Sequence, residues 1–184
     1  AGGAAQSMPA LLDRNAKAYP KKAAYREKEF GIWQSWTWAE TREEIRMLAL
    51  GLLDLGVQRG DFIAIIGANR PHLYWSIVAA QMIGAVPVPL YADSAADEMA
   101  YVLDHCGARF VIAEDQEQVD KISDIRAQLG ALEEVIYLDP KGMRKYDHSH
   151  LHDFVGIQTR GNAARGTLLV ELERRQGDIT YDDI

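Results

Sequence analysis

Three histidines near the C-terminal end of the chain have a spacing that suits metal binding. His148, His150 and His152 occupy alternate positions, so on an extended strand their imidazoles would face one way and could hold zinc. Asp147 and Asp153 flank them as further ligands or as partners of the imidazoles. The simpler interpretation is a hydrophilic surface loop, because no cysteine or spaced ligand pair accompanies the histidines. We therefore expect a loop and assign no metal ligand.

A second candidate site is the turn Gly67-Ala68-Asn69, which follows an apolar run and precedes a helical segment. Backbone N–H groups at a helix N-terminus can bind phosphate. A dinucleotide site would need G-x-G-x-x-G, but the next glycine is Gly84, so we expect a tight turn and no nicotinamide or flavin site. Because ligands of open α/β sheets bind at the carboxyl ends of strands, Asn69, Tyr91 and Asp93 are candidate rim positions.

Clustered aromatic residues are a third candidate, for a ligand pocket. Trp33, Trp36 and Trp38 lie in or just after a predicted hairpin, and Tyr74 and Trp75 lie in a predicted helix. Aromatic side chains at such positions are favoured for packing. We expect core or surface cover from them.

No catalytic motif is present in the sequence. It contains no G-x-x-x-x-G-K-[ST], no G-x-S-x-G and no H-E-x-x-H. The single cysteine, Cys106, excludes an internal disulfide and fits a reducing compartment. It continues the apolar face of a predicted helix, which favours a small buried hydrophobe over a reactive thiol. We therefore assign no catalytic and no cofactor-binding residue.

The elements that would position these residues follow a regular pattern. Apolar runs begin near Phe62, Val86, Phe110 and Val135 at intervals of about 24 residues, the length of a strand, a helix and two loops. This predicts an α/β fold with a mostly parallel sheet flanked by helices, layered as in Rossmann or flavodoxin folds. Pro87 and Pro89 remove two N–H groups from one side of the second strand, which predicts an edge strand, a short ladder or a bulge.

An N-terminal helix and a β-hairpin are expected before the sheet. The helix covers 8–18, and the hairpin pairs 23–26 with 32–36 around Phe30-Gly31. Thr37 and Glu40 have the spacing of a capping box for a helix that ends at Gly56. Further helices are expected from Ser94, over 116–129 and over 167–175. The signal weakens over 139–164, where 141–145 and 147–150 are expected to form a surface loop.

Composition limits the classes of function. The 184 residues are 48% hydrophobic and 26% charged, as in ordinary globular proteins, and their length fits one domain. A net charge of −7 argues against nucleic-acid and anionic-membrane surfaces, which call for basic patches. No apolar run reaches the ~20 residues of a transmembrane span. Residues 1–7 are small and polar and are interpreted as a vector-derived or disordered remnant.

Several passages resemble the AMP-forming acyl-CoA synthetases of the adenylate-forming superfamily. In chain order, they are Thr37–Asp61, Ile65–Pro71, Ala79–Tyr91 and Glu98–Cys106. Arg109–Glu114 and Tyr137–Gly142 resemble the long-chain fatty acyl branch in particular. Two positions depart from the pattern: His72 stands where an acidic residue is common, and Cys106 stands where a serine is common.

The resemblance implies a function for a larger enzyme. Such enzymes use ATP and Mg²⁺ to convert a fatty acid or another carboxylate into an acyl-adenylate, and then pass the acyl group to coenzyme A. Their phosphate loop and catalytic residues follow a passage like Gly177–Ile184, where this sequence ends. The resemblance therefore implies that residues 8–184 are a partial N-terminal domain, inactive alone and without bound ATP, Mg²⁺ or coenzyme A. It also implies a cytoplasmic enzyme that is either free or membrane-peripheral.

Two alternatives remain open at this point. One is a stand-alone Rossmann-like or flavodoxin-like binding module, and the other is a non-enzymatic interaction domain. We also expect self-association, because a sheet that is part of a larger enzyme exposes apolar area.

Overall fold

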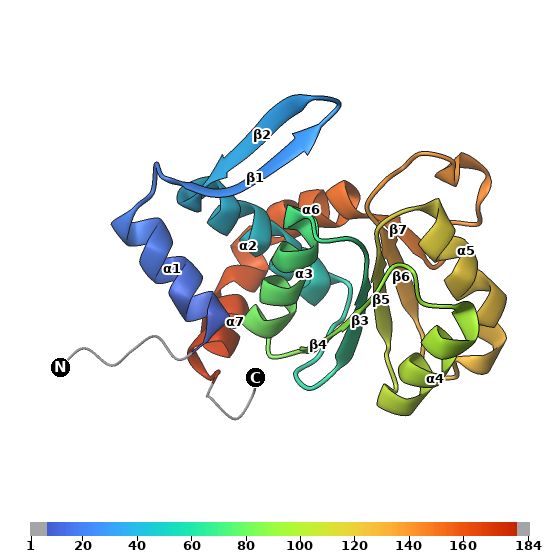
Figure 1. The fold of residues 1–184 in the computed structure, drawn as a ribbon. Coiled ribbons are helices and arrows are strands. Elements are labelled where there is room, and N and C mark those ends of the chain that lie inside the picture. The colour runs from blue at the N-terminus through green and yellow to red at the C-terminus, as the bar shows by residue number, and fades with distance from the viewer. Residues whose placement is uncertain (1–6, 180–184) are drawn as a thin grey trace.

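A five-stranded parallel sheet lies at the centre of the chain, in the order β4-β3-β5-β6-β7 (Figure 1). The computed structural model describes residues 7–179. The strands are β3 (Phe62–Ile66), β4 (Val86–Leu90), β5 (Phe110–Ala113), β6 (Glu134–Tyr137) and β7 (Leu151–Asp153). The first four begin within one residue of the predicted positions, which confirms the α/β interpretation of the apolar runs.

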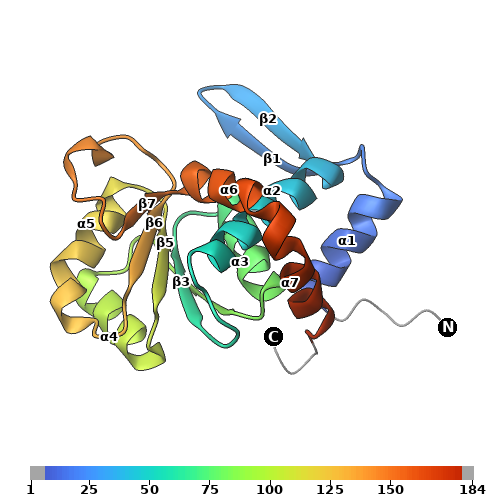
Figure 2. The same cartoon turned by 180° about the vertical axis from the view of Figure 1, so that it is seen from behind.

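Helices cover both faces of this sheet, as the two opposite views show (Figures 1 and 2). Ile63, Ile65 and Ile112 point to one face, where they share a core with α1 (Met8–Ala18), α2 (Trp38–Asp54), α3 (Pro71–Met82), α6 (Phe154–Ala163) and α7 (Arg165–Gly177). Ala64 and Val111 point to the other face, towards α4 (Ala96–Cys106) and α5 (Gln116–Ile125). This alternation places a hydrophobic core on each side of the sheet.

The hairpin formed by β1 (Ala23–Glu29) and β2 (Ile32–Thr37) projects from the body beyond the sheet (Figure 2). Its turn lies at the predicted residues, with φ values of 47° at Phe30 and 80° at Gly31. The capping box is also confirmed, because Thr37 accepts a hydrogen bond from the Glu40 amide and the Glu40 carboxylate accepts one from the Thr37 amide. The hairpin is therefore joined directly to a well-capped α2.

The prolines of β4 lie at an edge of the sheet, as predicted. The Val86 amide donates to the carbonyl oxygen of Asp61, 2.8 Å away, on the side of β3. Amides alternate in direction along a strand, so the nitrogens of Pro87 and Pro89 face the free edge. β4 thus pairs with β3 along all five residues and offers no donor outwards at these two positions.

The surface loop expected over 141–145 and 147–150 is present, with one short 3₁₀ turn, and it is followed by two elements that the weak sequence signal did not predict. β7 adds a fifth parallel strand, with Leu151 opposite Val135, and α6 follows it directly. Asp153 caps this helix, because its carboxylate accepts a hydrogen bond from the Gly156 amide at 2.7 Å. The short 3₁₀ turn Met143–Lys145 is the only helix or strand within residues 138–150.

Several predicted helix bounds need smaller corrections. α4 begins at Ala96 rather than Ser94, and the Ala95 amide donates to the Glu98 side chain at its start. The expected helix over 116–129 ends at Ile125 and continues as a 3₁₀ turn, Arg126–Gln128. The final helix begins two residues earlier and ends two residues later than expected.

Two glycines allow α2 and α6 to pack closely. A Cβ on Gly161 would lie 2.2 Å from the Met47 carbonyl oxygen, and one on Gly51 would lie 2.2 Å from the Ile157 carbonyl oxygen. Distances this short leave no room for a side chain. The glycines therefore set the approach of the two helices.

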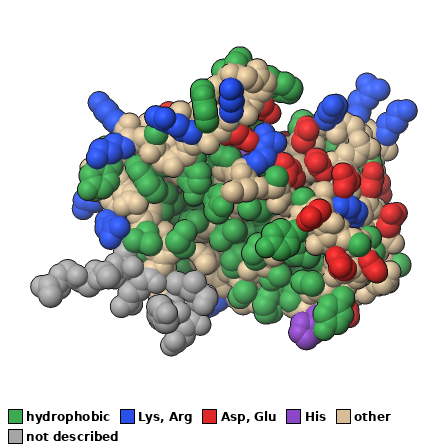
Figure 3. All heavy atoms as spheres, viewed as in Figure 1, with side chains coloured by type: hydrophobic (Ala, Val, Ile, Leu, Met, Phe, Trp, Pro, Cys, Tyr) green, Lys and Arg blue, Asp and Glu red, His purple; other side chains and the backbone are tan. Residues whose placement is uncertain are grey.

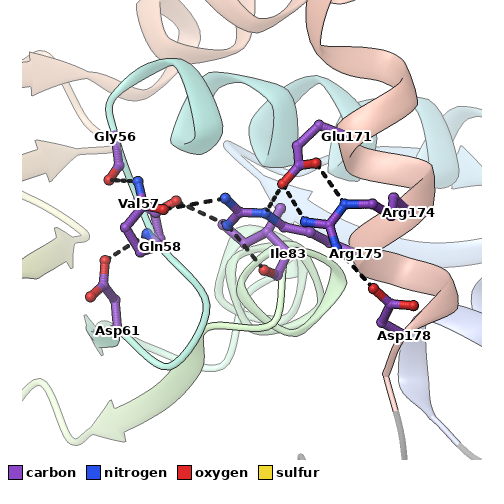
Figure 4. Close-up of polar contacts among 9 residues, drawn as sticks. All are labelled: Gly56, Val57, Gln58, Asp61, Ile83, Glu171, Arg174, Arg175 and Asp178. Atoms are coloured by element: carbon purple, nitrogen blue, oxygen red, sulfur yellow. Dashed lines mark hydrogen bonds and ion pairs between the residues drawn. The ribbon is translucent and has the colours of Figure 1, made fainter.

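Arg175 connects α7 to the loops that precede β3 and β4 (Figure 4). Its Nη1 donates to the Val57 carbonyl oxygen at 3.1 Å, and its Nε donates to the Glu171 carboxylate at 2.6 Å.

No helix within residues 7–179 is both long and apolar enough to cross a bilayer.

Candidate functional site

A cavity of about 460 Å³ lies between the hairpin and the carboxyl ends of β3, β5 and β6. Its apolar side is formed by Ile65 and Ile112 from the sheet, Leu73 from α3 and Leu138 after β6. Trp36 of β2 contributes an aromatic wall. Ligands of open α/β folds bind at the carboxyl ends of the strands, where this cavity lies. The cavity is therefore the best candidate site in the described residues.

Arg70 lies at the rim of this cavity, between three carboxylates. Its guanidinium pairs with Glu27 through Nε, with Glu29 at 3.5 Å and with Glu114 at 3.4 Å. The hydrogen bond with Glu27 is the largest influence on the Arg70 guanidinium and holds its pKa above the usual value. The hairpin and the sheet are thus joined through one arginine.

The rim carries an excess of negative charge. Its carboxylates come from Glu27, Glu29, Glu114 and Asp139, and its cations are Arg70 and Lys141. Four carboxylates against two cations leave a balance of −2. Such a rim repels phosphates and carboxylates.

The turn after β3 is a structural turn, as the missing glycine fingerprint indicated. The Ala68 amide donates to the Glu114 carboxylate, and a Cβ on Gly67 would lie 3.0 Å from the Glu114 Oε2 atom. An internal carboxylate therefore occupies the position that a bound phosphate would need. Asn69 does not line the cavity; its side chain accepts a hydrogen bond from the Tyr74 hydroxyl at 2.7 Å.

His72 forms part of the cavity wall among aromatic rings. Its ring centroid lies 4.6 Å from that of Trp75, 5.6 Å from that of Phe154 and 6.4 Å from that of Trp36. Burial is the largest influence on its pKa and lowers it. A neutral His72 therefore packs between the hairpin and α6.

The three histidines of the candidate metal site do not converge on one point. The His148 ring nitrogens face the carbonyl oxygens of Met143 and Leu151, at 3.1 and 3.3 Å. His150 and His152 contact the two oxygens of Glu134, at 3.2 and 2.8 Å. Within residues 7–179, no three His, Cys, Asp or Glu side chains are placed to hold a metal ion. His148 and His150 lie in the expected loop, whereas His152 lies on β7.

The remaining candidates lie away from the cavity. Tyr91 is 81% exposed, and neither it nor Asp93 lines the cavity. Cys106 is half-buried, and burial raises the pKa of its thiol, as expected for a packing residue. Trp75 is buried as predicted, but Trp33 is 64% exposed.

The sequence interpretation missed Arg70 and its three carboxylates. One signal was present, namely the alternation Arg26-Glu27-Lys28-Glu29, which places like charges on one face of a strand. Their partner Arg70, the residue before α3, carried no comparable signal.

This arrangement has the features of a binding cavity, with apolar walls and a polar rim. The described lining contains no serine, threonine or cysteine that could act as a nucleophile. Three of its four carboxylates pair with Arg70, Asp139 accepts a hydrogen bond from the Lys141 amide, and the negative rim does not fit a phosphate chain. We therefore assign no reaction step to these residues.

Comparisons with known proteins agree with this fold. Residues 12–164 match the family model described as "AMP-binding enzyme". The long-chain-fatty-acid–CoA ligase FadD15 of Mycobacterium tuberculosis is 31% identical over 147 residues, which are 79% of this chain and 24% of that protein. The chain therefore spans about a quarter of the length of that ligase.

Two further similarities differ in their extent. The uncharacterized protein Rv1549 of Mycobacterium tuberculosis is 36% identical over 133 residues, which cover 72% of this chain and 73% of that protein. The crystal structure of coronafacic acid ligase from Pectobacterium brasiliense superposes with a TM-score of 0.72 at 21% identity, over 82% of this chain and 29% of that one. The structural likeness establishes a shared fold.

Proposed function

The chain belongs to the AMP-binding enzyme family, and from this premise we propose that it is the N-terminal part of a fatty acid–CoA ligase. In this proposal the whole enzyme uses ATP and Mg²⁺ to activate a fatty acid as an acyl-adenylate and then forms a thioester with coenzyme A. The observation that carries it is the 31% identity to a long-chain-fatty-acid–CoA ligase over most of this chain. The long-chain type of substrate is inferred from that relative.

The 184 residues are proposed to be inactive alone. Adenylyl transfer needs backbone N–H groups, cations and a metal ion around the developing charge. The described cavity has a negative rim, and Glu114 already accepts the hydrogen bond of the Ala68 amide at the turn after β3. These residues do not fit ATP, which supports placing ATP, Mg²⁺ and coenzyme A on other parts of the enzyme.

An ATP–pyrophosphate exchange assay tests both statements. The 184-residue chain and the longest product of its gene would each be incubated with palmitate, ATP, Mg²⁺ and labelled pyrophosphate. We expect palmitate-dependent exchange from a longer product and none from the 184 residues. Exchange by the short chain would refute its inactivity, and a longer product without fatty acid activation would refute the proposed activity.

A second candidate is supported by the length of Rv1549. This chain matches 73% of that protein, so a relative of similar size exists. The candidate function is a stand-alone binding or interaction module with the fold of a ligase domain. An immunoblot of the source cells distinguishes the two, because a product of 20.5 kDa supports the module and a product several times larger supports the ligase.

We place the whole enzyme in the cytoplasm, with a peripheral contact to a membrane.

We also expect the 184-residue chain to self-associate. Exposed side chains such as Tyr91 and Val170, which are 81% and 78% exposed, support self-association. Sedimentation velocity across a range of concentrations tests it, and a strictly monomeric profile would contradict it.

A further inference from the structure

The tip of the β1–β2 hairpin exposes three large apolar side chains within four residues. Phe30 is 97% exposed, Ile32 is 65% exposed and Trp33 is 64% exposed. The hairpin stands away from the body of the molecule in both views (Figures 1 and 2). Exposed apolar groups gathered on a projecting element are typical of a contact surface.

The charges of β1 are separated between the two faces of the hairpin. Glu27 and Glu29 lie on the inner face, where they pair with Arg70. Arg26 and Lys28 alternate with them and lie on the outer face, where Lys28 is directly opposite Trp33. Neither cation has an ion-pair partner among residues 7–179. The outer face is therefore basic and aromatic.

The hairpin is held firmly at its base. Trp36 packs edge-on against Trp75 with ring centroids 5.3 Å apart, and Tyr25 stacks on Tyr74 at 6.0 Å. Together with the ion pairs of Arg70, these contacts fix the direction in which the tip points. Its apolar side chains are presented without a large ordering cost on binding.

We propose that the hairpin docks on an anionic lipid bilayer. Phe30 and Trp33 enter the boundary between headgroups and acyl chains, where aromatic side chains are favoured. Arg26 and Lys28 remain at the level of the anionic headgroups. Charge complementarity selects this partner, because the outer face combines unpaired cations with aromatic groups and carries no carboxylate on β1.

The net charge of −7 led us to expect no contact with anionic membranes. The charge of the hairpin itself matters more for such a contact than the net charge of the chain. Acidic side chains gather mainly on the side of the molecule that carries α4 and α5, whereas over the hairpin apolar and basic side chains lie outside a few acidic ones (Figure 3). Salt screens charges beyond about 8 Å at physiological ionic strength. The electrostatic interaction with the bilayer therefore comes mainly from the charges of the hairpin. This inference deepens the peripheral location proposed above and does not depend on ligase activity.

Vesicle co-sedimentation of the 184-residue chain tests the proposal. We expect it to pellet with phosphatidylcholine–phosphatidylglycerol vesicles in 50 mM salt and to remain in solution with pure phosphatidylcholine. The double variant Phe30→Ser/Trp33→Ser should lose at least about tenfold in partitioning. Arg26→Gln/Lys28→Gln should lose about fivefold per charge removed. The control is Val170→Ser on α7, which removes an equally exposed side chain elsewhere.

Trp33 offers a second measurement that does not depend on pelleting. Insertion should shift the tryptophan emission of the wild type to shorter wavelength on anionic vesicles, and Trp33→Phe should remove most of that shift. Far-UV circular dichroism confirms that each variant is folded.

Three results would overturn the proposal. They are equal partitioning of the wild type and the tip variant, no partitioning into anionic vesicles, and loss of self-association in the tip variant without any vesicle binding. The last result would make the tip a protein–protein contact. The exchange assay is independent, so a failure here leaves the ligase proposal standing.

Discussion

Arg175 on α7 donates a hydrogen bond from Nη1 to the carbonyl oxygen of Val57, 3.1 Å away, at the turn between α2 and β3 (Figure 4). The two residues are 118 positions apart in the chain. Nη1 also lies 3.5 Å from the Ile83 carbonyl oxygen, before β4. One side chain therefore connects the last described helix to the loops that precede two strands.

The first prediction concerns this connection. Arg175→Ala should lower the free energy of unfolding by about 1–3 kcal/mol, because it leaves the Val57 carbonyl without its donor. Urea denaturation followed by circular dichroism measures the change. The matched control is the neighbouring Arg174→Ala, whose side chain is 60% exposed and forms surface ion pairs with Glu171 and Asp178. Such pairs contribute about 0–1 kcal/mol, so equal losses in the two variants would contradict the assignment.

The second prediction concerns the crossing of α2 and α6. Gly161→Ala should lower the free energy of unfolding by about 1–3 kcal/mol, because the added methyl group has no space beside the Met47 carbonyl oxygen. Alanine favours helices more than glycine does, so helix propensity alone predicts the opposite sign.

The control for that substitution is on the next helix. Gly166 lies in α7, and a Cβ there would meet nothing within 4 Å. Gly166→Ala should be neutral or raise the free energy of unfolding by up to about 1 kcal/mol. The urea midpoints of the two variants are compared with that of the wild type. A stabilised Gly161→Ala protein would show that the two helices are not in close contact.

The same glycines explain where prediction from the sequence failed. β3 to β6 are short apolar runs at regular intervals, and each is bounded by turns, so their pattern identifies them. α6 contains Gly156 and Gly161, which weaken a helix pattern, and β7 has only three residues. Tertiary contacts hold both elements: α6 by its packing on α2, and β7 by its ladder with β6.

The cavity could not be predicted for a different reason. Its wall joins the hairpin, the turn after β3 and the ends of β5 and β6, and Arg70 meets Glu27 and Glu114 across 43 and 44 positions of the chain. Sequence periodicity reports which face of an element is buried, but not which distant charges meet at the end of a sheet. The rule for carboxyl ends of strands points to the same end of the sheet as the cavity, but the residues that it selected, Asn69, Tyr91 and Asp93, do not line the cavity.

The third prediction is a dependence of stability on pH. Burial lowers the pKa of His72 in the folded state, so below the unfolded value of about 6.5 the unfolded chain binds a proton that the folded chain resists. Stability should therefore fall as the pH falls through 6.5. The contribution of this one group is at most about 1.4 kcal/mol at pH 5.5.

His72→Phe isolates this contribution, because phenylalanine keeps an aromatic ring beside Trp75. Urea midpoints at pH 7.5 and 5.5 should differ less in the variant than in the wild type. Arginine hydrogen bonds lower the pKa of Glu133 and lower that of Glu171 to about 2. Their stabilising contributions are lost only below about pH 4.5, outside this interval. Equal differences in the two proteins would mean that His72 is not the responsible group.

The fourth prediction concerns the free edge of β4. Pro87 and Pro89 deprive this edge of two outward donors, which hinders the addition of another strand. Pro87→Val/Pro89→Val restores both N–H groups and adds two residues that favour strands. The variant should form larger assemblies than the wild type and bind thioflavin T, as sedimentation velocity and dye fluorescence would show.

Pro140→Val is the control for this pair, because it removes a proline from the loop after β6 and leaves the β4 edge unchanged. If the control aggregates as strongly as the double variant, general destabilisation is the cause. If the double variant instead matches the wild type, the prolines do not protect the edge. An increase confined to the double variant would show that the two missing amide protons keep the free edge of β4 from pairing with another strand.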